Sequence, residues 1–265
     1  MISYIGGKSY LASWIISQFP LNYQKMSYVE VFGGGGWVLF KKEQSNLETY
    51  NDLNSNLVAL FRTIRDNYKE FEHRAQWSLH SREMYKEAKE KLNQDKFLSD
   101  VEKGLFFALN KIQTFSGGNS NSWGACVTAE KIVSGRWLPF LKRLEYVNAR
   151  LKRVQIECLD FEKLIKKYDG KNTLFYLDPP YDGLEHYYNI QGVNFSPVDH
   201  ERLAKLLRKI KGKFVLSYYD TDKIRSLYEG FRWERKEVIK HSCDVSRKSK
   251  LKFKPKSTEI LIMNY

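Results

Sequence analysis

The 265-residue sequence predicts an α/β fold, a Rossmann-like sheet interrupted by a mostly helical insertion. The segment Tyr28–Phe40 has the order strand, glycine turn, helix, which is typical of nucleotide-binding α/β units. The apolar run Thr173–Leu177 predicts a buried strand, and Asp178 follows it directly. Residues 66–150 are rich in Lys and Glu at helical spacing and show no strand pattern until late.

The N-terminal part contains two strand signals, each followed by a helix signal. Tyr28–Phe32 predicts a short strand that runs into the turn Gly33–Gly36. Thr49–Asp52 predicts a second strand, which ends in an acid about 20 residues past the glycine turn, where such units bind ribose hydroxyls. Apolar residues at helical spacing then predict a helix over Asn54–Arg65.

The middle of the chain is predicted to be helical. Ser99–Glu102 has the pattern of a capping box before an apolar helix face. The polar, glycine-rich segment 114–126 predicts a hairpin or extended flap, and Trp137–Leu151 predicts a further helix. These patterns divide the chain into a first α/β part (1–60), a helical insertion (61–150) and a second α/β part (151–265).

The α/β pattern resumes after the insertion. Val154–Leu159 alternates as a strand and ends at Asp160 and Phe161. Ser196 and Pro197 predict a capped helix start, and Gly212 is expected to end that helix. Three further strands are predicted at 213–218, 235–240 and 258–264.

Composition excludes several classes of protein. The 42% hydrophobic content suffices for a large core, and no run of about 18 apolar residues could span a membrane. The N-terminus lacks a secretion-signal pattern, and three widely spaced cysteines favour a reducing compartment over disulfides or a zinc site, so we expect a cytoplasmic protein. A net charge of +13 with 15% aromatic residues favours nucleic acid as partner, although charge for solubility is the alternative.

The tetrapeptide Asp178–Tyr181 is the strongest chemical signal. It places a carboxylate, two prolines and an aromatic ring at the carboxyl end of a strand, where open α/β sheets bind ligands. The prolines remove backbone donors and leave carbonyl acceptors. Acceptors beside a flat ring suit a planar amino group, such as that of a nucleobase. A Pro-Pro turn with a capping Asp is the alternative interpretation.

Together these features resemble the Dam-type (D12 class, alpha group) DNA adenine-N6 methyltransferases, which use S-adenosylmethionine (SAM). The resemblance covers nearly the whole chain, with the motifs in the family's order. It rests on Tyr4–Lys8, Glu30–Gly35, Asn51–Asn54, Ala108–Lys111 with Ser116–Gly118, Asp178–Tyr181 and Tyr187–Asp199. It implies a SAM-dependent methyltransferase fold, a target-recognition role for the insertion, and a site-specific enzyme that methylates adenine in double-stranded DNA.

The resemblance also implies roles for particular residues. The catalytic residues would be Asp178, Pro179, Pro180 and Tyr181. SAM, with S-adenosylhomocysteine as product, would contact Tyr4, Gly7, Lys8, Glu30, Phe32, Gly33, Gly35, Asp52, Asp160, Phe161 and Asp178. DNA would contact Lys111, Asn119, Asn121, Tyr187, Arg247, Lys248 and Lys250. No metal and no membrane are expected, and a monomer is expected in solution.

Two features depart from the family pattern. Tyr4 stands where the family often carries Trp, a change that keeps an aromatic ring. The loop Gly117–Trp123 contains no Arg, whereas GATC-specific relatives place arginines near the hairpin tip. Bidentate recognition of guanine by Arg from this loop is therefore excluded. Two alternatives are left: Asn119 and Asn121 contact adenine, or the enzyme is relaxed in its sequence preference. GATC specificity is therefore not carried over from the resemblance.

Three other functions compete with this interpretation. The first is an amino methyltransferase acting on RNA, cytosine N4 or glutamine, but Asp178 favours adenine because those cytosine and glutamine enzymes tend to carry Ser or Asn there. The second is a DNA-binding protein without catalysis. The third is a dinucleotide-dependent oxidoreductase. The fingerprint of those enzymes has a third glycine where this chain has Val38 or Leu39, which argues against that function. The scattered histidines, including His186 and His200, are expected at surface or capping positions.

Overall fold

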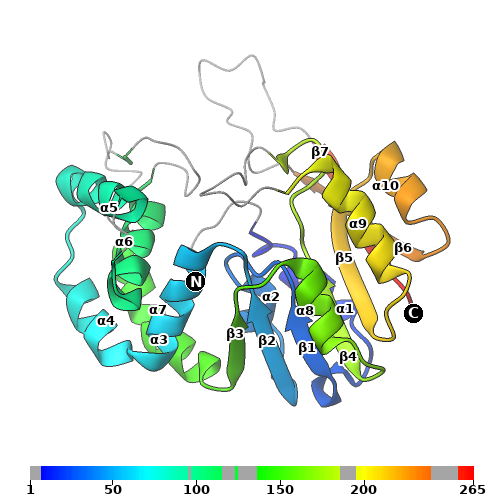
Figure 1. The fold of residues 1–265 in the computed structure, drawn as a ribbon, viewed down its shortest axis with the longest axis horizontal. Coiled ribbons are helices and arrows are strands. Elements are labelled where there is room, and N and C mark those ends of the chain that lie inside the picture. Colours follow the sequence, from blue (N-terminus) through cyan, green and yellow to red (C-terminus); the bar gives the residue numbers. More distant parts are fainter. Residues whose placement is uncertain (1–6, 95–96, 115–122, 125–135, 186–194, 240–255) are drawn as a thin grey trace.

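The computed structural model of the chain describes residues 7–94, 97–114, 123–124, 136–185, 195–239 and 256–265. In this part, seven strands form one sheet with the order β3-β2-β1-β4-β5-β7-β6 (Figure 1). The strands are β1 (Ser27–Glu30), β2 (Leu47–Asn51), β3 (Val154–Glu157), β4 (Thr173–Leu177), β5 (Lys213–Tyr219), β6 (Arg232–Ile239) and β7 (Lys256–Met263). The sheet and its flanking helices confirm the predicted Rossmann-like α/β fold.

The strands β3, β2, β1, β4 and β5 run parallel, whereas β7 is antiparallel to both β5 and β6. Val29 of β1 lies between Thr49 of β2 and Phe175 of β4. The carboxyl ends of these strands therefore lie together, at what we call the carboxyl end of the sheet. Strand β7 begins there, because Glu259 pairs with Tyr219 at the end of β5.

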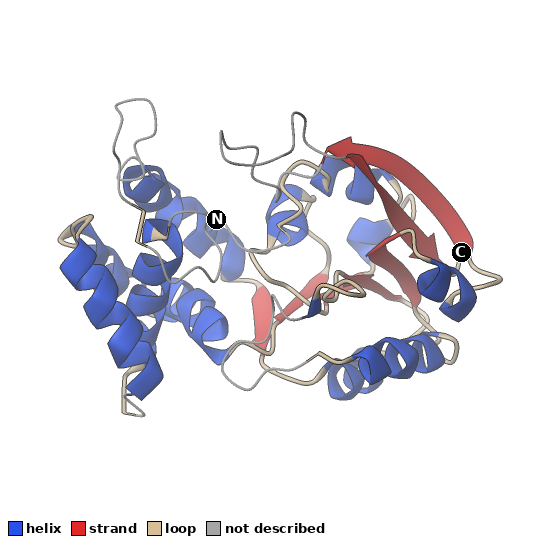
Figure 2. Ribbon diagram, turned by 90° about the horizontal axis from the view of Figure 1, so that it is seen from above, coloured by secondary structure: helices blue, strands red, loops and turns tan. Residues whose placement is uncertain are grey.

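Alternating side chains of the central strands fill two cores, one on each face of the sheet. In β4, Leu174 and Tyr176 belong to one core, and Phe175 and Leu177 belong to the other. All five residues of β4 are buried, as expected for a parallel strand with both faces covered. Viewed from above, helices lie on both sides of the strands (Figure 2).

The helices divide between the two cores. Those numbered α1 to α7 contribute to the first core, and α8, α9 and α10 pack on the opposite face. Their bounds are α1 (Ala12–Ser17), α2 (Trp37–Lys41), α3 (Ser55–Asp66), α4 (Tyr68–Gln76), α5 (Arg82–Gln94), α6 (Asp100–Gln113), α7 (Trp137–Leu151), α8 (Phe161–Tyr168), α9 (Pro197–Leu207) and α10 (Asp222–Leu227), with a short 3-10 helix at Tyr23–Lys25.

Helices α3 to α7 gather beyond strand β3, to the left in Figure 1. Thr114, after α6, forms an antiparallel bridge with Trp123, and the Gly124 N–H donates to the Gln113 carbonyl over 2.8 Å. The two ends of the intervening loop therefore lie side by side. Helix α3 runs without a break across residues 60 and 61, where the first predicted part of the chain was expected to end. The division of the chain into three parts stays a prediction.

Local capping signals predicted two helix starts correctly. Both Ser99 and Ser196 form reciprocal capping boxes, with Pro197 in the first turn of α9. However, α9 ends at Leu207 and not near Gly212, because the Asp169 carboxylate accepts N–H bonds from Lys211 and Gly212 and fixes a turn there. Helices α1, α8 and α10 were not predicted, since six to eight residues are too few for a clear periodicity.

Candidate active site

Lys8 and Asp178 meet at the carboxyl end of the sheet. Asp178 directly follows β4, and Lys8 lies before α1, where its carbonyl accepts the N–H bonds of Leu11 and Ala12. The Lys8 ammonium lies 3.0 Å from Asp178 Oδ1 and 4.5 Å from the centre of the Tyr181 ring. The N-terminal segment is therefore held against the tetrapeptide by one ion pair and one cation–π contact.

The environment of Asp178 changes its acidity. Burial raises the pKa of this carboxyl to about 6, against the opposing positive charge of Lys8, while the charge of Glu259 raises it further. The side chain nevertheless keeps 17% of its surface exposed. The carboxylate is thus ionised at neutral pH, yet it is a better proton acceptor than an ordinary Asp.

Tyr181 lies in the interior with only 5% of its surface exposed. Its hydroxyl donates to Glu259 Oε2 over 2.7 Å, and its ring meets Tyr219 edge-on with centroids 4.5 Å apart. Because Lys8 lies over the ring, a base that stacked on that face would displace the ammonium.

The turn after β1 is tied to Asp52, which follows β2. The Gly34 N–H donates to Asp52 Oδ2 and the Asn54 N–H to Oδ1, each over 2.8 Å. Burial raises the pKa of Asp52, although these two backbone bonds oppose the shift. A Cβ on Gly33 would lie 2.1 Å from the Tyr50 ring, so glycine is required there for packing against β2.

Asn51, at the end of β2, was not among the predicted site residues. Its Nδ2 donates to the carbonyls of Val31 and Leu159 over 2.9 and 3.0 Å, and its Oδ1 accepts the Leu159 N–H over 2.8 Å. One buried amide thereby joins the chain segments that leave β1, β2 and β3. Asn51 lies in the family-like segment Asn51–Asn54, but this role could not be predicted, because its two partner residues, Val31 and Leu159, are distant along the chain.

The pair Asp160 and Phe161 opens α8. Asp160 caps this helix through the Glu162 N–H and forms an ion pair with Arg202 of α9 over 2.6 Å. The Arg202 guanidinium also lies 4.2 Å from the centre of the Phe161 ring. Phe32, which follows β1, lies beside Phe161 with centroids 5.7 Å apart. An aromatic pair with a cation over one ring is thus placed next to the glycine turn, and Arg202 was not predicted as part of it.

Glu30 is an acid in the interior of the sheet, only 1% exposed. Its Oε2 accepts the Tyr28 hydroxyl over 2.7 Å. Burial raises the pKa of Glu30 to about 8, although hydrogen bonds from Tyr28 and the Leu39 backbone oppose the shift. Glu30 therefore carries a proton at neutral pH for most of the time.

The predicted DNA contacts are mostly outside the described residues, as is one predicted SAM contact. Of the DNA contacts, Lys111 is described: it is 5% exposed, it lies over the Phe107 ring, and burial lowers its pKa to about 8. Gly7, Gly35, Pro179 and Pro180 lie in the described part at the carboxyl end of the sheet. Those outside it are Tyr4, Asn119, Asn121, Tyr187, Arg247, Lys248 and Lys250.

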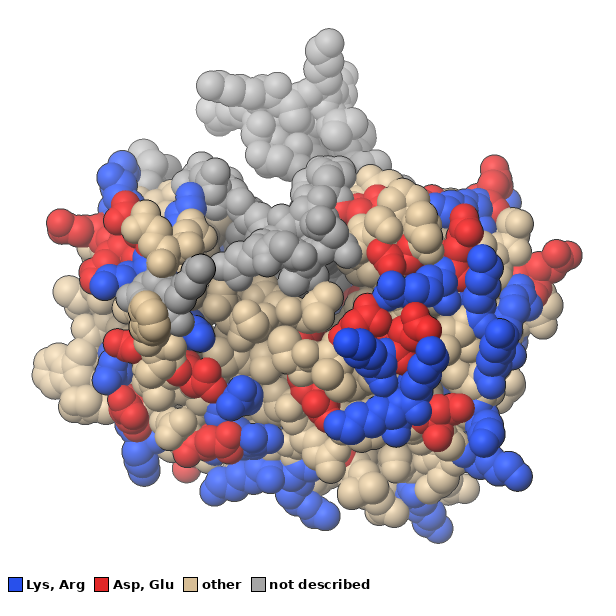
Figure 3. Space-filling view, viewed as in Figure 1, with Lys and Arg blue, Asp and Glu red and all other residues tan. Residues whose placement is uncertain are grey.

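Lys and Arg side chains gather over α8 and α9 on the face shown in Figure 3, interspersed with acids. Lys166 pairs with Glu162 over 2.6 Å and Lys205 with Glu201 over 4.0 Å, so part of this positive charge is balanced locally. Among the helices that the structure describes, none combines the length and the apolar character needed to cross a lipid bilayer.

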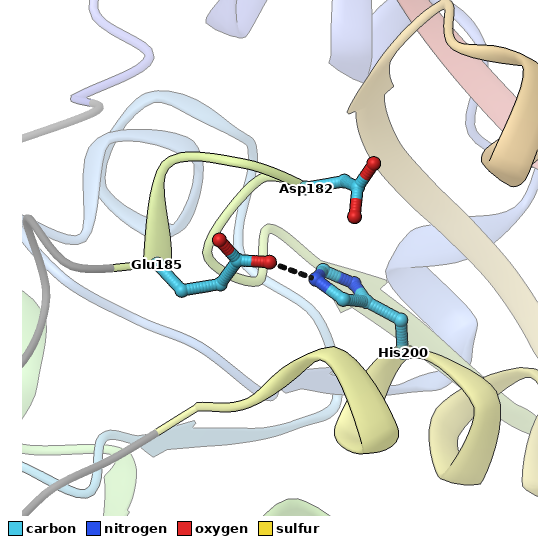
Figure 4. Close-up of side chains that lie close together, drawn as sticks. All are labelled: Asp182, Glu185 and His200. Atoms are coloured by element: carbon cyan, nitrogen blue, oxygen red, sulfur yellow. Dashed lines mark hydrogen bonds and ion pairs between the residues drawn. The ribbon is translucent and has the colours of Figure 1, made fainter.

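Asp182, Glu185 and His200 form a cluster that spacing along the chain did not reveal (Figure 4). Their ligand atoms lie within 4.8 Å of one another, close enough to hold a metal ion. However, the His200 nitrogens already meet Glu185 over 3.0 Å and the Tyr218 hydroxyl over 2.7 Å, and Lys223 donates to Asp182 over 2.9 Å. Hydrogen bonds and an ion pair therefore account for the cluster. The expected surface or capping position of His200 was wrong, because the side chain is fully buried.

Comparison with known proteins agrees with this geometry. A family described as D12 class N6 adenine-specific DNA methyltransferase matches residues 4–241. The type II methyltransferase M.CviBI of Paramecium bursaria Chlorella virus NC1A is 25% identical, over 90% of both chains. The DNA adenine methylase of Haemophilus influenzae is 24% identical over 89% of this chain and 85% of its own length. The type II methyltransferase M1.LlaDCHI of Lactococcus lactis subsp. cremoris is 26% identical over 98% of this chain and 93% of its own length. The chain therefore belongs to the D12 class of N6 adenine-specific DNA methyltransferases.

Proposed function

We propose that the chain transfers the methyl group of SAM to N6 of an adenine turned out of duplex DNA, at the carboxyl end of β1 and β4. One observation carries this assignment. Asp178 leaves β4 beside the glycine turn that leaves β1, at the point where the strand order reverses. Open α/β sheets bind their ligands at this switch point.

The residues at this point suit SAM. Each Asp52 oxygen accepts one backbone N–H and keeps a lone pair for a ribose hydroxyl. Phe32, which is partly exposed and packs on the buried Phe161, offers ring surface for the cofactor's adenine, with Asp160 nearby. Bound there, SAM supplies an electrophilic methyl on a sulfonium that leaves as a neutral thioether. The full proposed set is Tyr4, Gly7, Lys8, Glu30, Phe32, Gly33, Gly35, Asp52, Asp160, Phe161 and Asp178.

The chain's own contribution to the reaction is to provide hydrogen-bond acceptors for the amino group of the target adenine. The adenine N6 lone pair is delocalised into the ring, so the nitrogen is a poor nucleophile. Asp178 and the Pro179 carbonyl would accept hydrogen bonds from its two N–H groups and direct the lone pair at the methyl. The nitrogen–carbon bond forms as the carbon–sulfur bond breaks, and one N6 proton passes to Asp178, for which a pKa of about 6 is suited.

The target base would stack on Tyr181, a contact worth roughly 1–3 kcal/mol. Turning the base out of the helix is required because its N6 is otherwise within the duplex. Arrival of the base would displace the Lys8 ammonium from the ring face, and the adenine amino group would replace it as the donor to Asp178. The residues proposed to contact DNA are Lys111, Asn119, Asn121, Tyr187, Arg247, Lys248 and Lys250. We also propose that the protein acts in the cytoplasm as a monomer.

The test is to incubate the purified protein with SAM and unmethylated duplex DNA, digest the DNA to nucleosides and measure N6-methyladenine by mass spectrometry. Asp178→Ala should lower the yield about a hundredfold or more while DNA binding persists. Asp220→Ala is a matched control, since this Asp follows β5 but pairs with Arg225 and Arg235. N4-methylcytosine in place of N6-methyladenine, methylation of RNA alone, or full activity of Asp178→Ala would each refute the assignment.

A further inference from the structure

The hydrogen bond between Tyr181 and Glu259 joins the tetrapeptide to the last strand of the sheet. The phenol donates to Glu259 Oε2 over 2.7 Å, and the two residues are 5% and 2% exposed. A carboxylate is costly to bury, so an acid retained in the interior needs an explanation beyond packing.

The pattern of β7 makes this acid stand out. Glu259, Leu261 and Met263 share one face of the strand, and the last two belong to the first core. Ile260 and Ile262 point to the opposite core. An apolar residue at 259 would continue the buried stripe, yet the chain has Glu at the position where β7 reaches the carboxyl end of the sheet.

Glu259 completes a set of contacts that define the placement of the Tyr181 ring. Lys8 lies over one face at 4.5 Å, and Tyr219, the strand partner of Glu259, meets the ring edge-on. Glu259 fixes the hydroxyl. Lys8 also pairs with Asp178 over 3.0 Å, so the same ammonium contacts both the Tyr181 ring and the Asp178 carboxylate.

We propose that Glu259 is a positioning residue for methyl transfer: it anchors the Tyr181 hydroxyl, so that the ring and the Asp178 carboxylate keep the arrangement that a target adenine needs. The inference rests on the proposed catalytic role of Asp178 and Tyr181. Two prolines with fixed φ link these residues, so a shift of the Tyr181 backbone would be transmitted to Asp178. Anchoring matters most when the base displaces Lys8, because the hydroxyl bond then continues to hold the ring.

The first experiment measures kcat, KM for DNA and the dissociation constant for SAM in Glu259→Ala and Glu259→Gln. Misplacing the ring and carboxylate should lower kcat of Glu259→Ala by about ten- to a hundredfold, with unchanged SAM affinity. Glu259→Gln keeps an acceptor oxygen and should restore most of the rate. The matched control is Glu234→Ala on neighbouring β6, where the acid is 40% exposed and pairs with Arg232.

The second experiment repeats Glu259→Ala in a Tyr181→Phe background. If Glu259 acts through the hydroxyl, its removal should lower kcat far less in that background than in the natural chain. Equal losses in both backgrounds, an unchanged kcat in Glu259→Ala, or a parallel loss of SAM affinity would overturn the proposal. If Glu259→Ala does not fold, Tyr181→Phe alone removes the same hydrogen bond, and natural kcat in that variant would also refute it.

The two proposals fail in different ways. Natural activity in Asp178→Ala would refute the proposed catalytic site and leave no role for Glu259 to support. A large loss in Asp178→Ala, together with natural activity in Glu259→Ala, would refute the positioning role alone.

Discussion

Lys8 and Asp178 form an ion pair of 3.0 Å in which the side chains are only 7% and 17% exposed. Removing two charges from water is costly, and their attraction offsets this cost only while both partners are present. The pair thus links the N-terminal segment to the end of β4, and the state of either residue depends on the other. Two predictions about pH follow from this dependence.

We expect the rate of methyl transfer to fall as the pH drops through about 6. Burial raises the pKa of Asp178 to about 6, so the carboxylate that must accept the amino proton is itself protonated below that pH. The measurement is kcat/KM for a duplex substrate from pH 4.5 to 9, with folding followed by circular dichroism at each pH. A value of kcat/KM that stayed nearly constant down to pH 5 would mean that Asp178 behaves as an ordinary exposed carboxyl.

Lys8→Met should move this acidic limb to higher pH. The positive charge of Lys8 lowers the pKa of Asp178 against the larger effect of burial, and methionine removes the charge while retaining an unbranched chain. The same kcat/KM profile measures the shift. Lys25→Met, at an exposed position before β1, should leave the limb in place. A limb that stays near 6 in Lys8→Met would show that the ion pair does not control this carboxyl.

Local patterns predicted most of the fold. Helix α7 was expected over Trp137–Leu151 and has those bounds, because its apolar spacing and its packing agree. The strand before Asp178 was also correct, since five consecutive apolar or β-branched residues between polar turns favour a buried strand. Such signals depend on neighbours in the sequence, so they can be evaluated without knowing the fold.

The parts of the site that were missed depend on contacts between distant segments. Glu259 is an isolated acid in an apolar strand, and its partner lies in the loop after β4. His200 was expected at the surface or at a cap because the histidines are scattered along the chain, yet it is buried between Tyr218 and Glu185. Arg202 approaches Phe161 because α9 packs beside α8. Residue type and spacing do not encode these pairings, which arise only from the packing of the elements.

Glu30→Gln should stabilise the protein at neutral and alkaline pH. The pKa of Glu30 is about 8 in the fold but that of an ordinary carboxyl when unfolded, so the native state binds the proton more tightly. Stability contributed by this group is therefore complete below about pH 4.5 and is lost as the pH rises towards 8. Glutamine is neutral throughout and can still accept the Tyr28 hydroxyl.

The expected gain for Glu30→Gln is on the order of 4 kcal/mol at pH 8 and close to zero at pH 4.5. Urea unfolding at both pH values measures this gain. Glu43→Gln is the control, since the Glu43 side chain is exposed and, among the contacts described, its carboxylate accepts only a surface bond from Gln24. A gain of equal size at both pH values would point to packing and not to the proton.

Asn51→Ala should destabilise the protein and weaken SAM binding together. The amide makes three hydrogen bonds, and its loss leaves the buried Val31 carbonyl and the partly buried carbonyl and N–H of Leu159 without this partner. Each such group costs about 1 kcal/mol or more, so a loss of roughly 2–4 kcal/mol is expected by urea unfolding. SAM affinity, measured by calorimetry where the variant is folded, should fall because Asp52 and Leu159 flank the proposed cofactor site. Asn46→Ala removes a single 3.3 Å bond at the surface and should change neither quantity; an Asn51→Ala variant with natural stability would show that the three strand ends hold together without it.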